Sequence, residues 1–458
     1  MKDLTKEIFT MLFLLTDARY LLRTHKFHEG GRYLPRGELM RILVEIKESL
    51  KRVEDIIERD DYLDVGGMDI VEGLEVRTIE EEYININPIQ VGGRLTPEAM
   101  KAIIAYADGY SVCDWCLKPF RLDRIRRPQL ERFHKELAEF IGMREARLVP
   151  GARRGFQAVI NSVARDGIVV VSSLAHYTEY LAAEEAGAKV YEIPVGENNI
   201  IRPENLEEKI TEIKRKMGEE PDLVIVDHVD YQYGNLHPIR DLSRVAHEHG
   251  IPVLCNCAYT LGIMPVDGRK LEVDFIVGSG HKSFSSPAPS GILGIGDEYV
   301  ERVLSGSRIR GDISGRTYPN KETSILGCTL MGCTAVAMMA SFPRVKERVR
   351  RWGEEVEKAN HFCQQFLRIA GNRVLSEMPR RHTLIRVDTR ESFDKIARGH
   401  KRKGYFLYEE LRNRGITGIF PGATRIWKLN TYGLSWDEVR YLSETFIEIA
   451  KKYGIEVQ

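Results

Sequence analysis

The sequence predicts an α/β protein whose centre is a mostly parallel β-sheet with helices on both faces. Between about residues 83 and 340, short apolar segments alternate with helical stretches. Strands that are apolar on both faces and separated by helices are typical of parallel sheets, whose binding sites lie at the carboxyl ends of the strands. The predicted strands are ARLVP, GIVVVSS, AKVYEI, DLVIVDH, IPVLCNC, DFIVGSG and GILGIG.

Two smaller parts flank this central domain of residues 83–340. At 458 residues the chain is too long for one core, and its length suggests about three domains. Residues 1–82 place apolar side chains at helical spacing and predict a helical extension, with a turn at HEGGRYLPRGE. Residues 341–458 predict a small α+β domain, with one long charged helix, PRVKERVRRWGEEVEKANHFCQQFLRIA, then the strands HTLIRVDT and TRIWKLN and a final helix.

Composition limits the possible partners. Lys plus Arg and Asp plus Glu both number 67, so the net charge gives no sign of nucleic acid or membrane, although a local basic patch could still bind RNA. The N-terminal apolar run spans only residues 11–15, too short for a signal peptide or a membrane span. Seven cysteines form no regular disulfide framework, so we expect a cytoplasmic protein with reduced thiols and no membrane partner.

The segment VDFIVGSGHKSFSSPAPSGILGI places Lys282 directly after a buried strand. Desolvation disfavours the ammonium form of a lysine. A neutral amine is a nucleophile, as Schiff-base chemistry on an aldehyde cofactor requires. The sequence therefore predicts that Lys282 binds pyridoxal phosphate.

Three other motifs follow predicted strands. PGARRGFQAVINSVA opens a helix after ARLV, and its exposed amide groups could hold a phosphate, although taken alone the segment is better explained as a plain strand-to-helix turn. His176, in SSLAHYTEY, could cover a pyridine ring or be structural. Asn256, in LCNCAYTLG, precedes Lys282 by 26 residues.

In this order the motifs resemble the fold-type-I pyridoxal-phosphate enzymes of the cysteine desulfurase branch, roughly over residues 84–455. The resemblance implies that Lys282 forms the Schiff base and that His176 stacks on the ring. Asn256 would face the ring nitrogen, and Gln232, in DHVDYQYGN, the cofactor's hydroxyl side. The implied phosphate contacts are Ser279, His281 and the backbone amides of Ala152 and Arg153.

Position 256 departs from the desulfurase pattern. Those enzymes have an aspartate there that keeps the pyridine nitrogen protonated, whereas this chain has Asn256. An uncharged amide makes the ring a weaker electron sink. This suits a substrate whose β-substituent leaves readily, and phosphate is such a group.

Four longer segments narrow the resemblance: INPIQVGGRLTPEA, DGYSVCDWC, NCAYTLGIMPVDG and WKLNTYGLSWDEV. They are similar to the O-phosphoseryl-tRNA:cysteinyl-tRNA synthase family over nearly everything after the N-terminal extension. That family replaces the phosphate of phosphoserine, esterified to cysteine tRNA, with sulfur. The resemblance implies that the Lys282 amine takes the α-proton and later returns it.

The same resemblance implies that sulfur passes through cysteines. Cys113, Cys116 and Cys257 would act as persulfide carriers or as ligands of an iron–sulfur cluster, and a carrier needs an accessible thiolate. A C-x-x-C pair alone could equally be a metal clip or a redox pair. If the strand stays regular through Asn256, Cys257 points away from the cofactor, so its role requires the strand to end or twist there. We expect the other cysteines to be packing residues: Cys255, Cys328, Cys333 and Cys363.

Removal of a phosphate dianion favours bidentate contacts with arginine. Arg425, in GATRIWKLN, sits where related enzymes hold a substrate carboxylate. An aminoacyl ester has no free carboxylate, so we assign Arg425 to the terminal nucleotide or to structure. The candidates for substrate contacts are Arg94, Arg154, Tyr177 and Arg316.

The resemblance also implies a homodimer, in which residues 327–329 reach the neighbouring cofactor phosphate. In the extension, MRILVEIKESLKRVEDII carries an apolar stripe opposite alternating charges, a pattern suited to docking on another helical surface. We expect the extension to bind the ligase that makes phosphoseryl-tRNA, or otherwise to cover the dimer.

Two other functions fit parts of the sequence. A cysteine desulfurase or related lyase acting on a free amino acid would use Cys328 or Cys333 on a mobile loop, but Asn256 and the early C-x-x-C argue against it. The second alternative is a cofactor-bearing scaffold whose N-terminal helices recruit an aminoacylating partner and whose catalysis is secondary.

Overall fold

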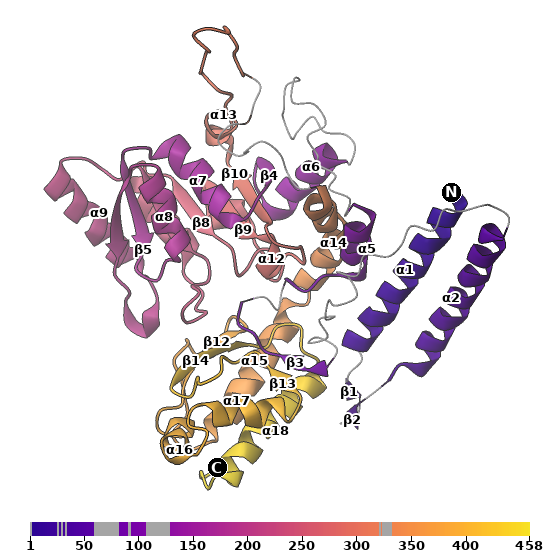
Figure 1. The fold of residues 1–458 in the computed structure, drawn as a ribbon. Helices are drawn as coiled ribbons and strands as arrows, with labels where there is room; N and C mark the ends of the chain where they lie inside the picture. Colours follow the sequence, from indigo (N-terminus) through magenta and orange to yellow (C-terminus); the bar gives the residue numbers. More distant parts are fainter. Residues whose placement is uncertain are drawn as a thin grey trace.

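The structure is a computed structural model that describes residues 2–24, 27–28, 31–32, 34–58, 82–89, 93–106, 129–319, 322 and 332–458. Figure 1 shows a large domain around the central sheet, a smaller domain that holds the C-terminus, and a helical hairpin beside them. The sequence predicts three parts as well, and their bounds stay a prediction.

The central sheet has seven strands, in the order β4-β10-β9-β8-β7-β5-β6. Strands β5 to β9 run parallel to one another, whereas β10 is antiparallel to both β4 and β9. The prediction of a mostly parallel sheet is therefore confirmed, and every predicted strand is present. The strands are β4 (Glu145–Val149), β5 (Ile168–Ser172), β6 (Lys189–Ile193), β7 (Leu223–Asp227), β8 (Val253–Asn256), β9 (Phe275–Ser279) and β10 (Gly291–Ile295).

Helices enclose this sheet. Strands β5, β7, β8, β9 and β10 bury every residue. Because successive side chains of a strand point to opposite faces, complete burial requires cover on both faces. The helices are α6 (Leu130–Ile141), α7 (Ala152–Val163), α8 (Tyr177–Glu185), α9 (Pro203–Met217), α10 (Ile239–Glu248), α11 (Gly268–Leu271), α12 (Gly280–Ser283), α13 (Val300–Val303) and α14 (Gly332–Val349).

The C-terminal domain has its own core around an antiparallel sheet in the order β11-β12-β14. The predicted strands HTLIRVDT and TRIWKLN are β12 and β14. The domain contains α15 (Trp352–Leu367), β11 (Arg373–Val374), β12 (Leu384–Asp388), α16 (Phe393–Gly399), α17 (Tyr405–Arg412), β13 (Ile416–Thr417), β14 (Ile426–Asn430) and α18 (Trp436–Lys452).

The prediction that a single long helix starts this domain is wrong. The chain forms α14, which begins at Gly332, and a separate helix α15, which begins at Trp352. Phe342 of α14 belongs to the core of the large domain, whereas Phe362 of α15 belongs to the core of the small one. The chain turns between them because the two helices bury their apolar faces in different cores.

The first residues after the extension join the small domain. Strand β3 (Ile84–Asn85) pairs with β13, and Ile84 and Ile86 are buried in the C-terminal core. The division at residue 83 stays a prediction, with the addition that these residues tie the two domains together.

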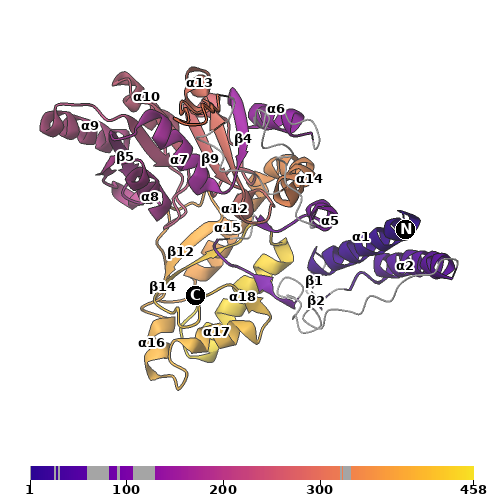
Figure 2. The same cartoon turned by 45° about the horizontal axis from the view of Figure 1, so that its top comes forward.

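The extension is a helical hairpin of α1 (Lys2–Thr24) and α2 (Arg36–Ile57), joined through the short strands β1 (Phe27–His28) and β2 (Gly31–Arg32). Helix α1 contacts α5 (Pro97–Ala105), where Asp17 Oδ2 lies 2.7 Å from Lys101 Nζ. Figures 1 and 2 show α2 as the outer helix. Within the described ranges, no helix is long and apolar enough to cross a membrane.

Candidate active site

The carboxyl ends of three neighbouring strands meet at one edge of the sheet. Asp227 is the last residue of β7 and pairs with Asn256, the last residue of β8. Strand β9 ends beside them at Ser279, and Lys282 follows in α12. The fold therefore brings together the strand ends from which the sequence predicts a site.

Lys282 is held in a mostly buried position. Burial, together with the charge of Lys428, lowers the pKa of Lys282 to about 8. Its Nζ lies 4.8 Å from the centre of the Tyr259 ring. The chain after it is clamped by Arg348 of α14, which donates to the carbonyl oxygens of Ser283 (2.6 Å) and Gly262 (2.7 Å). The amine is therefore positioned and more readily neutral than an ordinary lysine.

His176 immediately precedes α8, and its Nδ1 lies 2.9 Å from the Thr178 hydroxyl. Burial lowers the pKa of His176 to about 4, and the charges of Lys282 and Lys428 add to this effect. The edge of its ring meets Tyr231, with centroids 5.1 Å apart. A neutral, restrained imidazole is suited to stacking on a cofactor ring.

The start of α7 forms the turn that the sequence predicts to hold a phosphate. Gly151 has φ of +95°, a conformation that favours glycine. The N–H groups of Ala152 and Arg153 lie in the first turn of the helix, where no helical carbonyl can accept them. The Arg153 side chain binds Glu185, so its backbone is the part available for a phosphate.

Ser279 is the last residue of β9 and His281 lies two residues later, with Ser279 Oγ and His281 Nδ1 3.4 Å apart. Burial lowers the pKa of His281, as does the charge of Lys282, so the imidazole is predominantly neutral at neutral pH. Both side chains can therefore act as neutral hydrogen-bonding partners for a phosphate. Their predicted role stays a prediction.

Asn256 is fully engaged with two acidic side chains that sequence reasoning missed. Its Nδ2 donates to Glu179 Oε1 and to Asp227 Oδ1, each at 2.7 Å. Burial raises the pKa of Glu179 to about 8, and burial and the nearby charge of Glu179 raise that of Asp227 well above its usual range. An aspartate ending the apolar strand LVIVD was a usable signal, whereas Glu179 inside a helix gave none.

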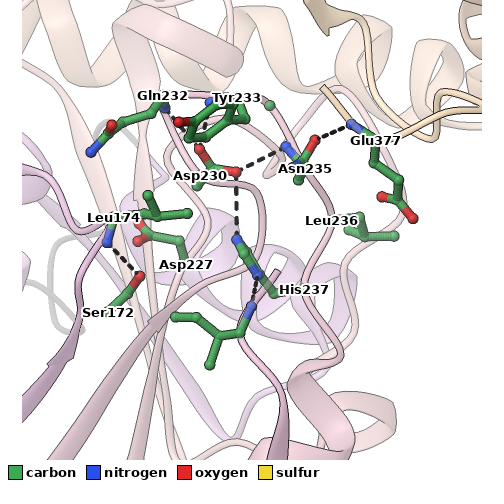
Figure 3. A network of polar contacts seen from close by, with 12 residues as sticks. Ser172, Leu174, Asp227, Asp230, Gln232, Tyr233, Asn235, Leu236, His237 and Glu377 are labelled. Carbon is green, nitrogen blue, oxygen red and sulfur yellow. Dashed lines mark hydrogen bonds and ion pairs between the residues drawn. The ribbon is translucent and has the colours of Figure 1, made fainter. Parts of the chain in front are cut away.

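A further carboxylate, Asp230, orders the loop after β7 (Figure 3). Its side chain accepts from the backbone N–H groups of Gln232, Tyr233 and Asn235 at 2.6 to 2.9 Å. His237 Nε2 lies 3.5 Å from Asp230 Oδ2. In Figure 3 the Gln232 side chain extends away from this carboxylate, and its predicted contact with the cofactor hydroxyl stays a prediction.

The structure gives no support to Cys257 as a sulfur carrier. Strand β8 ends at Asn256 as that role requires, but Cys257 is fully buried in the core, with its Sγ 3.5 Å from that of Cys255. Although burial opposes ionisation, contacts with Cys255 and His228 lower the pKa of Cys257 to about 5. A sulfur carrier needs a thiolate that other molecules can reach, and the Cys257 thiol is not accessible, so we remove Cys257 from the set of carriers.

The remaining cysteines divide into two groups. Cys255 and Cys363 are buried packing residues, as predicted, and Cys333 is half-buried. Within the part of the chain that the structure describes, no cluster of three His, Cys, Asp or Glu side chains could hold a metal. Three cysteines lie outside the described residues: Cys113, Cys116 and Cys328. Residues 327–329 lie outside them as well.

The candidate substrate arginines lie in different places. Arg94 donates to the Asn85 carbonyl at 2.9 Å and lines a cavity of about 540 Å³ that also reaches His281. Arg154 is half-buried in α7. Arg316 is exposed on the segment after α13, which Figure 1 shows extending away from the domain. Arg425 is exposed in the small domain, 3.9 Å from Asp394.

Known proteins are similar to this chain in sequence and in fold. The model of the aminotransferase class-V family matches residues 126–392. The O-phospho-L-seryl-tRNA:Cys-tRNA synthase 1 of Methanococcoides burtonii is 58% identical over 389 residues, which cover 85% of this chain and 85% of that protein. This chain belongs to the O-phospho-L-seryl-tRNA:Cys-tRNA synthase family. The predicted resemblance is confirmed.

Members of the synthase family differ in how much of this chain they match. The synthase 2 of Methanospirillum hungatei is 50% identical and covers all of this chain. The synthase of Methanoculleus marisnigri is 53% identical, and the match covers 84% of this chain and 98% of that protein. The remaining part of this chain therefore has almost no counterpart in that synthase.

Solved structures agree on the fold. A crystal structure of a SepCysS–SepCysE N-terminal domain complex matches with a TM-score of 0.76 and 39% identity, over 85% of this chain and 100% of that chain. A cysteine desulfurase from Thermococcus onnurineus matches 82% of this chain and 96% of that one, with a TM-score of 0.60 and 16% identity. The second likeness concerns the fold alone, so the desulfurase alternative is not favoured.

Proposed function

We propose that this protein converts O-phosphoseryl-tRNA(Cys) into cysteinyl-tRNA(Cys), with pyridoxal phosphate held by Lys282. The observation that carries the proposal is the mostly buried Lys282 side chain at the strand ends, beside His176 and Asn256, in a chain 58% identical to a named synthase. We place the protein in the cytoplasm, where its aminoacyl-tRNA product is used.

The residues of the site fit pyridoxal phosphate. The turn at Gly151 leaves the amides of Ala152 and Arg153 for a phosphate, and His176 provides a neutral flat ring. Two buried carboxyl oxygens, Glu179 Oε2 and Asp227 Oδ2, have no hydrogen-bond partner, so the site has polar capacity to spare. When bound, this cofactor withdraws electrons from the substrate α-carbon and so makes the α-proton acidic.

Lys282 is the base that this chain provides. A lysine whose pKa is about 8 keeps a substantial neutral fraction near neutral pH, and a neutral amine can take the α-proton and give it back. The bond between the substrate β-carbon and the phosphate oxygen breaks, phosphate leaves with that electron pair, and sulfur bonds to the same carbon. The Tyr259 ring and the Arg348 clamp keep the amine in place through these steps.

The tRNA end has a suitable binding surface beside the site. The cavity that reaches His281 is lined by Arg94 and, from helix α1, by Arg19 and Arg23. Guanidinium groups favour phosphate groups through paired hydrogen bonds. We assign this arginine cavity to the phosphate backbone of the terminal nucleotides, which gives the extension a part in substrate binding.

The sulfur route and the assembly complete the proposal. With Cys257 removed, Cys113 and Cys116 remain as persulfide carriers or cluster ligands. We propose a homodimer, in which residues 327–329 contribute to the neighbouring site.

The outer helix α2 suits a helical partner. It exposes a stripe of apolar side chains, among them Met40, Leu43 and Leu50, with 46 to 59% of each accessible. Exposed apolar stripes of this kind mark interaction surfaces. We propose the ligase that makes phosphoseryl-tRNA as the partner. The matched crystal structure is described as a complex of SepCysS with the N-terminal domain of a second protein.

A turnover assay tests the proposed function. Purified protein loaded with pyridoxal phosphate is given phosphoseryl-tRNA, free phosphoserine or free cysteine, with sulfide supplied where needed. We expect cysteinyl-tRNA from the first substrate and no comparable turnover of the other two. Release of sulfur from free cysteine at a similar rate would instead establish the desulfurase alternative.

A further inference from the structure

Hydrogen bonds to both ends of the Asn256 side-chain amide fix its orientation. Both hydrogens of Nδ2 are taken, one by Glu179 and one by Asp227, and Oδ1 accepts the Ala258 N–H at 3.1 Å. An amide is oriented by the network around it. Turning it over would set its oxygen against the two carboxyl groups and break the bond from Ala258.

The two carboxyl groups that fix the amide form a buried pair. Glu179 is fully buried and Asp227 is 2% exposed, and each keeps one oxygen without a hydrogen-bond partner. Two carboxylates this close cannot both ionise in a buried site, because desolvation and mutual repulsion favour a shared proton. The pair loses its first proton only near pH 8, the pKa of Glu179, and in either protonation state it accepts both Nδ2 hydrogens.

The charges around the pair act on these protonation states. Lys282 is the cation that lowers the pKa of Glu179 against the larger effect of burial. The carboxylate of Asp230 opposes ionisation of Asp227. Asp230 itself accepts hydrogen bonds from three backbone N–H groups.

This arrangement decides what Asn256 can offer to a pyridine nitrogen. With Nδ2 occupied, only Oδ1 has a free lone pair, and a carbonyl oxygen accepts but cannot donate. We propose that Glu179 and Asp227 are positioning residues that hold the Asn256 oxygen toward the cofactor's ring nitrogen and so keep that nitrogen protonated. The acid missing at position 256 is thus supplied by two residues behind it.

The inference rests on the proposed function, since it assumes pyridoxal phosphate at Lys282, and it reverses the expectation of a weaker electron sink drawn from Asn256 alone. The cofactor keeps its full electron-withdrawing capacity here. An amide held in one orientation by two buried carboxyl groups takes the place of one aspartate.

The direct test is the ¹⁵N resonance of the ring nitrogen in full-length protein loaded with ¹⁵N-labelled pyridoxal phosphate, because protonated and unprotonated pyridines have clearly different shifts. We expect the protonated signal in the unmodified protein. In the double variant E179Q/D227N, we expect the ratio of protonated to unprotonated nitrogen to fall about tenfold, equivalent to one pKa unit. The matched control is Glu184→Gln, at an exposed position of the same helix, and its signal should be unchanged.

A triple variant separates positioning from general disruption of the core. In E179Q/D227N/N256D the two new amides can donate to the new carboxylate, so the protonated signal should return. An unprotonated nitrogen in the unmodified protein would overturn the inference without any variant. So would a double variant that binds the cofactor and keeps the protonated signal. If borohydride fixes no cofactor on Lys282 in the unmodified protein, the proposed function fails instead.

Discussion

The sheet edge and the N-terminal hairpin break the usual distribution of side chains in opposite ways. At the sheet edge, the acidic side chains of Glu179 and Asp227 are buried beside Asn256, and Lys282 is mostly buried near them. On α2, large apolar side chains such as Met40 and Leu43 are exposed. Buried polar groups and exposed apolar patches are both informative exceptions. The comparison separates a rigid site for chemistry from a surface for binding.

The largest effect should follow from removal of the amine. Lys282→Ala deletes the group that holds the cofactor and moves the α-proton, so we expect turnover to fall by at least about 10³-fold. Borohydride should fix no cofactor on the variant, which mass spectrometry of the digested protein can check. A reducible covalent link that survives in Lys282→Ala would show that another residue holds the cofactor.

The arginine cavity joins the two regions, and its disruption should affect binding alone. In R19A/R23A we expect KM for phosphoseryl-tRNA to rise about tenfold with kcat unchanged. The logarithmic slope of binding against salt concentration should weaken by about 0.7 for each tRNA phosphate that the variant no longer binds. Arg41→Ala, on the exposed side of α2, is the control. An equal fall in kcat would place the arginines in the chemistry.

The lowered pKa of Lys282 predicts how the cofactor-free protein captures pyridoxal phosphate. Only the neutral amine reacts, so the capture rate should rise with pH and level off above about pH 8, the pKa of Lys282. At neutral pH the neutral fraction is roughly a few hundred-fold above that of an ordinary lysine. Lys428→Met removes a charge that lowers this pKa and should move the midpoint upward. Stopped-flow absorbance measures the rate, and a midpoint near that of free lysine would contradict the assignment.

The smallest effect concerns Arg153. Its side chain binds Glu185 at the surface and only its amide faces the proposed phosphate, so Arg153→Ala should change cofactor affinity less than about twofold. Gly151 has a positive φ that alanine adopts only with strain, so Gly151→Ala should weaken the binding free energy of the cofactor by about 1 kcal/mol or more. Equilibrium titration with pyridoxal phosphate compares the two. A larger fall in affinity for Arg153→Ala would mean that the guanidinium binds the phosphate.

The sequence predicts this fold well because its signals are local. Five of the seven strands of the central sheet, β5 and β7 to β10, are short apolar runs that are buried on both faces. The break between α14 and α15 escaped prediction because it depends on which core each helix enters, and a run of charges carries no such information. The site was predictable where residues end strands, as with Asn256 and Lys282. Glu179 was not, because only the packing of α8 against the strand ends brings it to Asn256.

Removal of residues 1–82 tests most directly whether the chemistry and the binding surface are separate. Loaded with pyridoxal phosphate and supplied with sulfide, the shortened protein should convert phosphoseryl-tRNA at an unchanged rate when the tRNA is saturating. Its KM should rise as in R19A/R23A, and it should no longer bind the ligase that makes phosphoseryl-tRNA. A fall in the saturating rate, or collapse of the folded protein, would contradict this account and make the hairpin part of the catalytic structure.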